Sequence, residues 1–408
     1  MASAQQAGQY TQHGFQDDPV MKFDIVVIGG GLAGASLLAA LKGSGLRLAL
    51  IESRPPAPLP DDDSWDARVY AISPGSVEFL QSSGIWQRMN AARITPVHEM
   101  RVHGDDNAAR IDFSAYESGV PELACIIENR QLQHAVWEEL AGAENVQIFC
   151  PAQCDSLAWQ DSHVELTLAD GTVLQTALLI GADGINSRVR EQAGIGVDRH
   201  SYYQTGVVAN FETERVHHHI AYQWFRRDGI LALLPLPGKR VSMVWSANTA
   251  LADELLNLSA EALCDRVARA AEYELGSMRL VTAPLGFPLN FVHARSLIKP
   301  RLALIGDAAH GIHPLAGQGV NLGLRDVREL ARLQRQFGGI GDCGEFSLLR
   351  CYERNRKEDI LAMGWVTDGL QKLFGSEDAA IMRIRNVGLG ITNRLPLLKN
   401  RLMRHALS

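Results

Sequence analysis

The stretch KFDIVVIGGGLAGASLLAALKGSGLRLALIE, residues 22–52, decides the fold. It begins with the apolar, β-branched residues 22–28, which are typical of a parallel strand covered on both faces. Glycines follow, and then residues 35–45, whose composition favours a helix. Residues 47–52 form a second apolar run that ends in an acid. This succession of strand, glycine turn, helix and strand predicts a dinucleotide-binding unit.

Each small or acidic residue of this unit has a physical task. Gly29 permits a tight turn, Gly31 lets the backbone approach a pyrophosphate, and Gly34 lets helix and strand pack closely. The free N–H groups at the helix start favour the negative phosphates. Glu52 can accept hydrogen bonds from ribose hydroxyls, and its carboxylate disfavours a 2′-phosphate. FAD or NAD therefore fits this site better than NADP, and a plain glycine-rich turn is the weaker alternative.

Composition excludes several classes of protein. With 408 residues, 46% hydrophobic and 21% charged, the chain is typical of a soluble globular protein of two or three domains. Its net charge of −7 argues against nucleic-acid binding. The six cysteines have no metal-ligand spacing, so we expect free thiols in a reducing cytoplasm and no metal site. The sequence has no apolar run of about 18 residues, so no membrane-spanning helix is expected.

The rest of the chain predicts how the domains are arranged. Residues 206–245 alternate as antiparallel strands, and 250–273 favour a helix. After them RLALIGDAAH, residues 301–310, returns the chain to a buried strand like the first. We therefore expect an α/β fold with a discontinuous Rossmann-like domain and a second domain on a mainly antiparallel sheet. The predicted boundaries are a disordered extension at 1–20, the Rossmann-like domain at 21–97, 125–200 and 285–345, the second domain at 98–124 and 201–284, and a C-terminal helical region at 346–408.

Two further motifs follow predicted buried strands. In LLIGADGINSRVR, residues 178–190, the chain turns at Asp183-Gly184 into a helix, for which a simple tight turn is the bland interpretation. In RLALIGDAAH, Asp307 ends a strand at the sheet edge where ligands bind. Gly317 and Gly319 then expose N–H groups just before a long helix. This second helix start would favour a ligand group that carries negative charge.

In their order and spacing these three motifs resemble those of FAD-dependent aromatic hydroxylases of the para-hydroxybenzoate hydroxylase type. HPLAGQGVNLGLRD at 313–326, YERNRK at 352–357 and LLPLPG at 233–238 are more narrowly similar to the ubiquinone-biosynthesis hydroxylase branch. The resemblance extends from about Met21 to the C-terminus.

The resemblance implies a role for each motif. Gly29, Gly31, Gly34 and Glu52 would hold the ADP half of FAD. The other residues that it implicates are Arg68 and Arg130 near the pyrophosphate and ribityl chain, Asp307 at a ribityl hydroxyl, Gly317, Gln318, Gly319, Val320 and Asn321 along the pyrimidine ring, and Asp183 and Gly184 for both FAD and NAD(P)H.

The reaction that the resemblance implies needs no metal. NAD(P)H reduces FAD, O2 adds, and a flavin C4a-hydroperoxide transfers oxygen to the ring of a polyprenylated phenol. His313 is the candidate catalytic base, and the alternative is a loop histidine that is hydrogen-bonded to the backbone. Tyr222, Trp224, Phe225 and Leu233 suit a substrate wall or core packing equally well, and the histidines at 217–219 are interpreted as an exposed edge or loop rather than a metal site.

The C-terminal sequence points to a location. Residues 379–408 hold six Lys or Arg and no Asp or Glu, interleaved with apolar residues. Such a segment suits the anionic inner face of the cytoplasmic membrane, so we expect a cytoplasmic protein in peripheral contact with it. The family resemblance further implies contact with a ubiquinone-biosynthesis assembly. A solvated helical face is the alternative. The rival functions are a same-fold monooxygenase acting on a soluble phenol or aromatic natural product, and a non-catalytic flavin- or lipid-binding scaffold.

Overall fold

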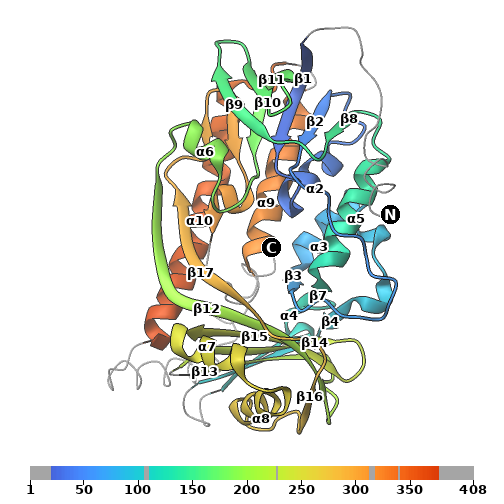
Figure 1. Cartoon of the computed structure of the whole chain (residues 1–408), viewed down its shortest axis with the longest axis vertical. Coiled ribbons are helices and arrows are strands. Elements are labelled where there is room, and N and C mark those ends of the chain that lie inside the picture. Colours follow the sequence, from blue (N-terminus) through green and yellow to red (C-terminus); the bar gives the residue numbers. More distant parts are fainter. Residues whose placement is uncertain (1–19, 105–109, 227, 312–317, 339–340, 376–408) are drawn as a thin grey trace.

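A mainly parallel sheet forms the upper half of the molecule in the computed structural model, which describes residues 20–104, 110–226, 228–311, 318–338 and 341–375 (Figure 1). At its centre β1 (Met21–Ile28) pairs in parallel with β2 (Leu48–Ile51) and with β11 (Val173–Gly181). The strand order is β18-β19-β11-β1-β2-β8, where β18 is Ile298–Lys299, β19 is Leu302–Leu304 and β8 is Val146–Phe149. The antiparallel strands β9 (Cys154–Trp159) and β10 (Val164–Leu168) extend it from β11.

Four helices lie beside this sheet in Figure 1: α2 (Leu32–Ala40), α5 (Asn129–Ala141), α9 (Gln318–Leu333) and α10 (Phe346–Gly375). Helix α2 is buried almost throughout, which explains why it is apolar all round. The strands expected at 22–28 and 47–52 are confirmed. The first helix, however, ends at Ala40 rather than near 45, because the following residues, Leu41 to Gly43, form a turn.

A second, larger sheet lies below, in the order β20-β17-β12-β15-β14-β13-β5-β6, with β16 (Met278–Leu280) attached to β12. Its strands are β20 (His310–Gly311), β17 (Leu285–Ala294), β12 (Val197–Thr213), β15 (Arg240–Asn248), β14 (Gly229–Leu236), β13 (Ile220–Arg226), β5 (Glu99–His103) and β6 (Arg110–Ser114). All of these pairs are antiparallel except β13 with β5. The expectation of a mainly antiparallel second sheet is therefore confirmed.

Two helices, α7 (Thr249–Asn257) and α8 (Ala260–Ala270), cover the lower face of this sheet (Figure 1). One helix over 250–273 was expected. The chain instead breaks at Leu258, whose extended backbone ends α7, and restarts at Ser259, whose side chain caps α8 by accepting from Ala262 N.

A three-stranded sheet, β3-β7-β4, lies between the two large ones. Its strands are β3 (Val69–Ile72), β7 (Ala124–Glu128) and β4 (Thr95–Val97). Helix α3 (Pro74–Ser82) follows β3, and Ser73 caps it with Pro74 in its first turn. The shorter helices are η1 (Trp86–Arg88), η2 (Ala91–Arg93), α4 (Ala115–Ser118), α6 (Arg188–Gln192), η3 (Gly306–Ala308) and η5 (Gln334–Gly338).

The long strands β12 and β17 connect the two halves, and β20 attaches the turn after β19 to β17. The predicted boundary at 97/98 falls between β4 and β5, whereas that at 200/201 falls inside β12; the domain boundaries stay a prediction. The predicted residues His313 and Gly317, nearly all of the expected extension at 1–20, and residues 376–408 lie outside the described residues. No described helix is both long and apolar enough to cross a membrane.

Candidate cofactor and active site

The glycine turn after β1 fits tightly against the end of β11. Gly29 has φ +110°, and a Cβ there would come within 2.3 Å of the Ala182 carbonyl oxygen. A Cβ on Gly34 would come within 2.0 Å of the Gly29 carbonyl oxygen. Gly31 caps α2, and a Cβ there would meet no atom within 4 Å. The start of α2 therefore faces open space and leaves its N–H groups available to an anionic ligand.

Glu52 holds this turn from the neighbouring strand. Its Oε2 accepts a hydrogen bond of 2.5 Å from Gly30 N, and its Oε1 accepts from Ser53 Oγ and Arg54 N, both at 3.0 Å. From the other side α5 donates to the Gly30 carbonyl through Gln133 Nε2 at 2.8 Å and Trp137 Nε1 at 2.9 Å. Glu52 thus lies beside the glycine turn as predicted, and it also fixes the turn itself. Its contact with a ribose stays a prediction.

Asp183 supports the turn that follows β11. Its Oδ1 accepts from Ser187 Oγ, and its Oδ2 accepts from the backbone N–H groups of Arg188 and Val189 at 2.8 and 3.1 Å. The carboxylate therefore caps α6, in agreement with the bland interpretation of the motif. Gly184, with φ +83°, makes the turn. Their predicted role toward FAD and NAD(P)H is untested by these contacts.

A buried arginine, absent from the sequence prediction, joins this turn to the GDAAH segment. Arg190 donates from Nη1 to the Ala308 carbonyl at 2.7 Å and from Nη2 to the Ile185 carbonyl at 3.0 Å. The motifs at 178–190 and 301–310 are therefore one structural unit.

The GDAAH turn meets the starts of both α2 and α9. Gly306 has φ +58°, and a Cβ there would lie 2.9 Å from the Ala33 Cβ. A Cβ on Gly323 of α9 would lie 3.4 Å from the Gly306 Cα. Asp307 is exposed at this junction, although protein surrounds it closely enough that desolvation raises the pKa of its carboxyl against the opposing charges of His310 and Arg68. The two predicted helix starts and Asp307 thus come together.

Arg68 stands between this junction and the antiparallel sheet. Its guanidinium lies 5.4 Å from the centre of the Tyr70 ring and 5.5 Å from that of Phe287 on β17. Burial raises the pKa of Tyr70 to about 12, and Arg68 and Asp307 both act on this pKa by their charge. The exposed Arg68 guanidinium is therefore near Asp307 and next to the lower sheet.

Arg130 is engaged with protein groups. It donates to Ser64 through Nη1 and Nη2, and its Nη2 lies 3.3 Å from Glu128. Glu128 is fully buried and also accepts from Arg93 and from Asp66 N, at 2.6 Å each. Arg130 thus anchors the loop at 64–66, and any contact with the pyrophosphate or ribityl chain stays a prediction.

The start of α9 is open where the prediction places a flavin ring. A Cβ on Gly319 would meet nothing within 4 Å. Val320 packs against the core of the upper half. The Asn321 side chain accepts from Ser73 N and donates to the Ala71 carbonyl, each at 2.8 Å, so it fastens α9 to the end of β3. The backbone of Gln318 begins the helix as predicted.

The residues expected to form a substrate wall lie on opposite faces of the lower sheet. Tyr222, Trp224 and Leu233 point toward α7 and α8 and belong to the core that these helices cover, so core packing explains them. Phe225 lies on the opposite face with Val102. That upper face also carries Leu285 and Phe287, which are 47% and 38% exposed. Among the described residues, these two side chains therefore expose apolar surface next to Arg68.

The histidine run forms no metal site. The interpretation of these histidines as an exposed edge or loop is wrong for His217, which is buried with its Nε2 2.8 Å from the Leu236 carbonyl oxygen. It holds for His218 and His219, which are exposed in a turn. The described part of the chain holds no group of three or more His, Cys, Asp or Glu that could bind a metal ion.

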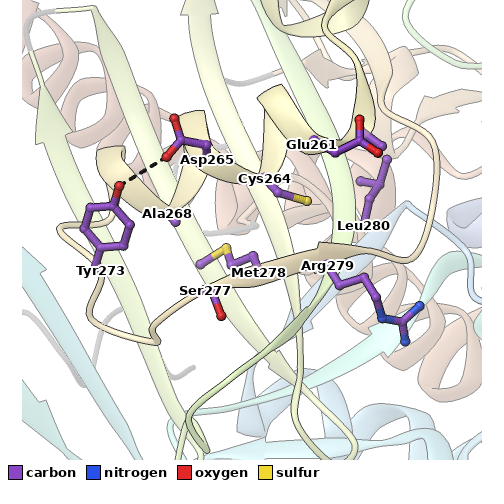
Figure 2. Close-up of a pocket in the computed structure, with 10 residues that line it drawn as sticks. Glu261, Cys264, Asp265, Ala268, Tyr273, Ser277, Met278, Arg279 and Leu280 are labelled. Carbon is purple, nitrogen blue, oxygen red and sulfur yellow. Dashed lines mark hydrogen bonds between the residues drawn. The ribbon is translucent and has the colours of Figure 1, made fainter.

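A cavity of about 390 Å³ lies on the other side of the lower sheet, between α8 and β16 (Figure 2). Cys264, Met278 and Leu280 line it, and the Tyr273 hydroxyl bonds Asp265 at its rim. None of the predicted site residues belongs to its lining, so it is separate from the candidate site.

The most highly connected group of the site was missed by the sequence analysis. Asp326 of α9 is fully buried and accepts from Gly306 N, His310 Nε2 and Arg356 Nε. Burial opposes its ionisation, but the charges of His310 and Arg356 outweigh burial and lower its pKa. Two features of the sequence could have indicated it: an acid within the apolar pattern of GVNLGLRD, residues 319–326, and the basic motif YERNRK, residues 352–357.

These residues fit FAD. No side chain caps the start of α2, space lies open beside Gly319 at the start of α9, an acid follows β2, and a second acid is exposed where the two helices approach each other. A Cβ at Gly31 or Gly319 would fall in open space, which is the room that a bound dinucleotide requires.

Comparison with known proteins agrees with this geometry. Residues 22–361 match the family described as FAD binding domain. The chain is 35% identical to a ubiquinone hydroxylase, UbiL, of Rhodospirillum rubrum, over 94% of this chain and 89% of that protein. It is 34% identical to the 3-demethoxyubiquinol 3-hydroxylase of Escherichia coli, over 94% and 98%. In fold it resembles PqsL, a probable FAD-dependent monooxygenase from Pseudomonas aeruginosa, with a TM-score of 0.75, 21% identity and coverage of 91% and 100%.

The chain therefore belongs to the FAD binding domain family and, within it, to the ubiquinone-biosynthesis hydroxylase branch of the FAD-dependent aromatic hydroxylases.

Proposed function

We propose that this chain is a FAD-dependent monooxygenase that hydroxylates the aromatic ring of a prenylated phenol in ubiquinone biosynthesis, with NAD(P)H and O2 as co-substrates. One observation carries the proposal: the Arg68 guanidinium acts by its charge on Asp307 and lies 5.5 Å from the centre of the exposed Phe287 ring, so the cofactor end of the upper half is next to exposed apolar side chains of the lower sheet. The identity to ubiquinone hydroxylases over 94% of the chain supports the substrate class.

We assign the ADP half of FAD to the start of α2 and to Glu52, and the ring to the start of α9 with Asp307. When bound and reduced, FAD supplies the activation of O2 for transfer of one oxygen atom to an aromatic ring. The chain supplies position. Open amides at α2 favour phosphates, and the Asp307 carboxylate is placed to accept a hydrogen bond from a hydroxyl.

The upper face of the lower sheet suits the substrate. Leu285 and Phe287 expose apolar surface, and Val244 and Ala232 of the neighbouring strands are half-buried on the same face. A phenol that carries a prenyl chain would cover these side chains and exclude water from the reacting ring. A small, charged phenol would leave part of this surface exposed.

The assignments of the NAD(P)H site and of the catalytic base come from the sequence alone. We assign the nicotinamide co-substrate to the neighbourhood of Asp183-Gly184 and keep His313 as the candidate base that deprotonates the phenol, both from the family resemblance.

We further propose peripheral contact with the anionic face of the cytoplasmic membrane through the basic residues of 379–408. Each basic side chain near the headgroups contributes about 1 kcal/mol. The full chain should float with vesicles that contain anionic lipid and stay behind with neutral ones. The double substitution Arg401→Gln and Arg404→Gln should weaken this flotation without changing FAD binding. Equal flotation with both kinds of vesicle would contradict the contact.

The test of the function uses the full chain reconstituted with FAD. NAD(P)H oxidation and product mass are measured with a prenylated phenol and with 4-hydroxybenzoate. We expect oxidation stimulated by the prenylated phenol and a product heavier by one oxygen atom. Preference for the soluble acid would favour the same-fold monooxygenase of soluble phenols. Oxidation that no phenol stimulates would favour the scaffold.

A further inference from the structure

Asp326 is tied to three separate elements around the predicted flavin ring. Its Oδ2 accepts from Gly306 N at 3.0 Å and lies 2.6 Å from His310 Nε2, and its Oδ1 accepts from Arg356 Nε at 2.7 Å. Both oxygens are therefore used, in a position with no solvent exposure. A buried carboxylate with three donors holds those donors in one arrangement.

Two of the donors bracket Asp307. Gly306 precedes it and His310 follows it, and both are held by the same Asp326 oxygen. The backbone between them can move only if one of these bonds breaks. The direction of the exposed Asp307 carboxylate, and the start of the segment that follows His310, are thus set by a residue that does not face the ligand.

The third donor brings in α10 and explains the YERNRK motif. Arg356 also donates to Asp359 through Nη1 at 2.7 Å and to the Leu322 carbonyl through Nη2 at 3.4 Å. Tyr352 donates its hydroxyl hydrogen to the Leu304 carbonyl at 2.9 Å, directly before the turn. Glu353 accepts from Ser296 Oγ and Leu297 N at 2.7 and 2.9 Å. The motif therefore fastens α10 to α9 and to the strands that carry the turn.

We propose that Asp326 is a positioning residue for the ring half of FAD, that it orients Asp307 through Gly306 and His310, and that Arg356 fixes Asp326 in place. This inference rests on the proposed FAD site. It assigns different partners to the two halves of the cofactor: the ADP half depends on α2 and Glu52, and the ring half depends on the Asp326 network.

The amide of asparagine distinguishes this role. Asp326→Asn keeps the shape but replaces one oxygen by an NH2 group, which must face a donor, either Arg356 or the pair Gly306 and His310. Glu329→Gln is the matched control, because Glu329 lies on the same helix and bonds Arg332 and Asn355 without touching the turn.

The experiment measures the affinity of the full apo-chain for FAD and for ADP, together with the visible circular dichroism of bound FAD. We expect Asp326→Asn to weaken FAD by about tenfold or more and ADP by less than about twofold, and to change the flavin signal. Glu329→Gln should leave both affinities and the signal unchanged.

A second variant separates positioning from general stability. Asp326→Asn with Arg356→Gln removes both members of the buried Asp326–Arg356 ion pair, so its melting temperature should recover relative to Asp326→Asn alone. Its FAD affinity should stay low, and it replaces the single variant if that one fails to fold. Equal weakening of FAD and ADP, or recovery of wild-type FAD affinity by the double variant, would overturn the inference. Failure of the wild-type chain to bind FAD would instead overturn the proposed function.

Discussion

The two ends of the candidate FAD site are built in different ways. At the nucleotide end one continuous segment, residues 29–52, supplies the glycine turn, the helix start and the acid. At the ring end the residues come from distant parts of the chain. Asn321, Asp326 and Arg356 fasten the elements through buried polar contacts, whereas Arg68 and Asp307 are exposed between them. The first end depends on close backbone packing, and the second on a buried charge network.

The two acids of the ring end also differ in their energetics. Desolvation raises the pKa of Asp307, whereas the charges of His310 and Arg356 overcome burial and lower that of Asp326. Ionised Asp307 therefore costs stability and ionised Asp326 contributes it. Binding sites commonly contain such a pair: one group that faces the ligand and lowers the stability of the fold, and a second group that supports it and raises that stability.

The largest effect is expected from removing the support of the ring end. Asp326→Asn should lower the free energy of unfolding of the apo-chain by about 3–5 kcal/mol at neutral pH, because His310 and Arg356 lose their fully buried carboxylate and Arg356 keeps only Asp359. Since the folded pKa of Asp326 is lowered from 3.8, its contribution is complete above that pH and is lost as pH falls through the folded pKa. Denaturant unfolding at several pH values measures this, and a difference that stays constant down to acid pH would contradict it.

Close packing at the nucleotide end should give the next largest effect. Gly34→Ala puts a Cβ within 2.0 Å of the Gly29 carbonyl oxygen, so we expect a loss of about 1–3 kcal/mol in unfolding free energy. Thermal and chemical unfolding of the apo-chain measure it. Wild-type stability in this variant would show that the backbone contact does not support the turn.

Gly31→Ala should weaken ligand binding without disturbing the packing of the protein. Its Cβ meets no protein atom within 4 Å, and its φ of −66° suits alanine, so unfolding free energy should change by less than about 0.5 kcal/mol. Affinities for FAD and ADP should both fall by about tenfold if phosphates lie there. Calorimetric titration with each ligand tests this. Unchanged affinities would show that no phosphate of the ligand binds at the start of α2.

The smallest effect is expected at Asp307. Its folded pKa is raised from 3.8, so its stabilising protonated form is lost as pH rises through the folded pKa. Asp307→Asn should therefore raise the stability of the apo-chain at neutral pH, by less than about 1 kcal/mol because the group is exposed. FAD binding should weaken in the same variant. Lower apo-stability would show that Asp307 supports the fold rather than the ligand.

The sequence predicts the nucleotide end well because its information is local. Strand, turn, helix and acid follow one another within residues 22–52. The ring end is predicted only in part. An acid after β19 is visible, but nothing local shows that Asp326 accepts from Gly306 or that Arg356 reaches it across 30 residues.

The lower sheet shows a second reason why the sequence predicts the site only in part. Strict alternation along β13 separates Trp224 from Phe225 into opposite faces, but it does not tell which face the helices α7 and α8 cover. That depends on packing between distant segments. For the same reason the sequence could not predict the contacts of Arg130 with Ser64 and Glu128, and its place beside the cofactor stays a prediction.

One titration tests most directly whether both ends serve a single cofactor. The purified full chain is titrated with FAD, and bound flavin is followed by its visible absorption with and without ADP. We predict one FAD per chain with shifted absorption bands, and competitive displacement by ADP. A chain that stays colourless in excess FAD, or FAD binding that ADP does not affect, would contradict the account.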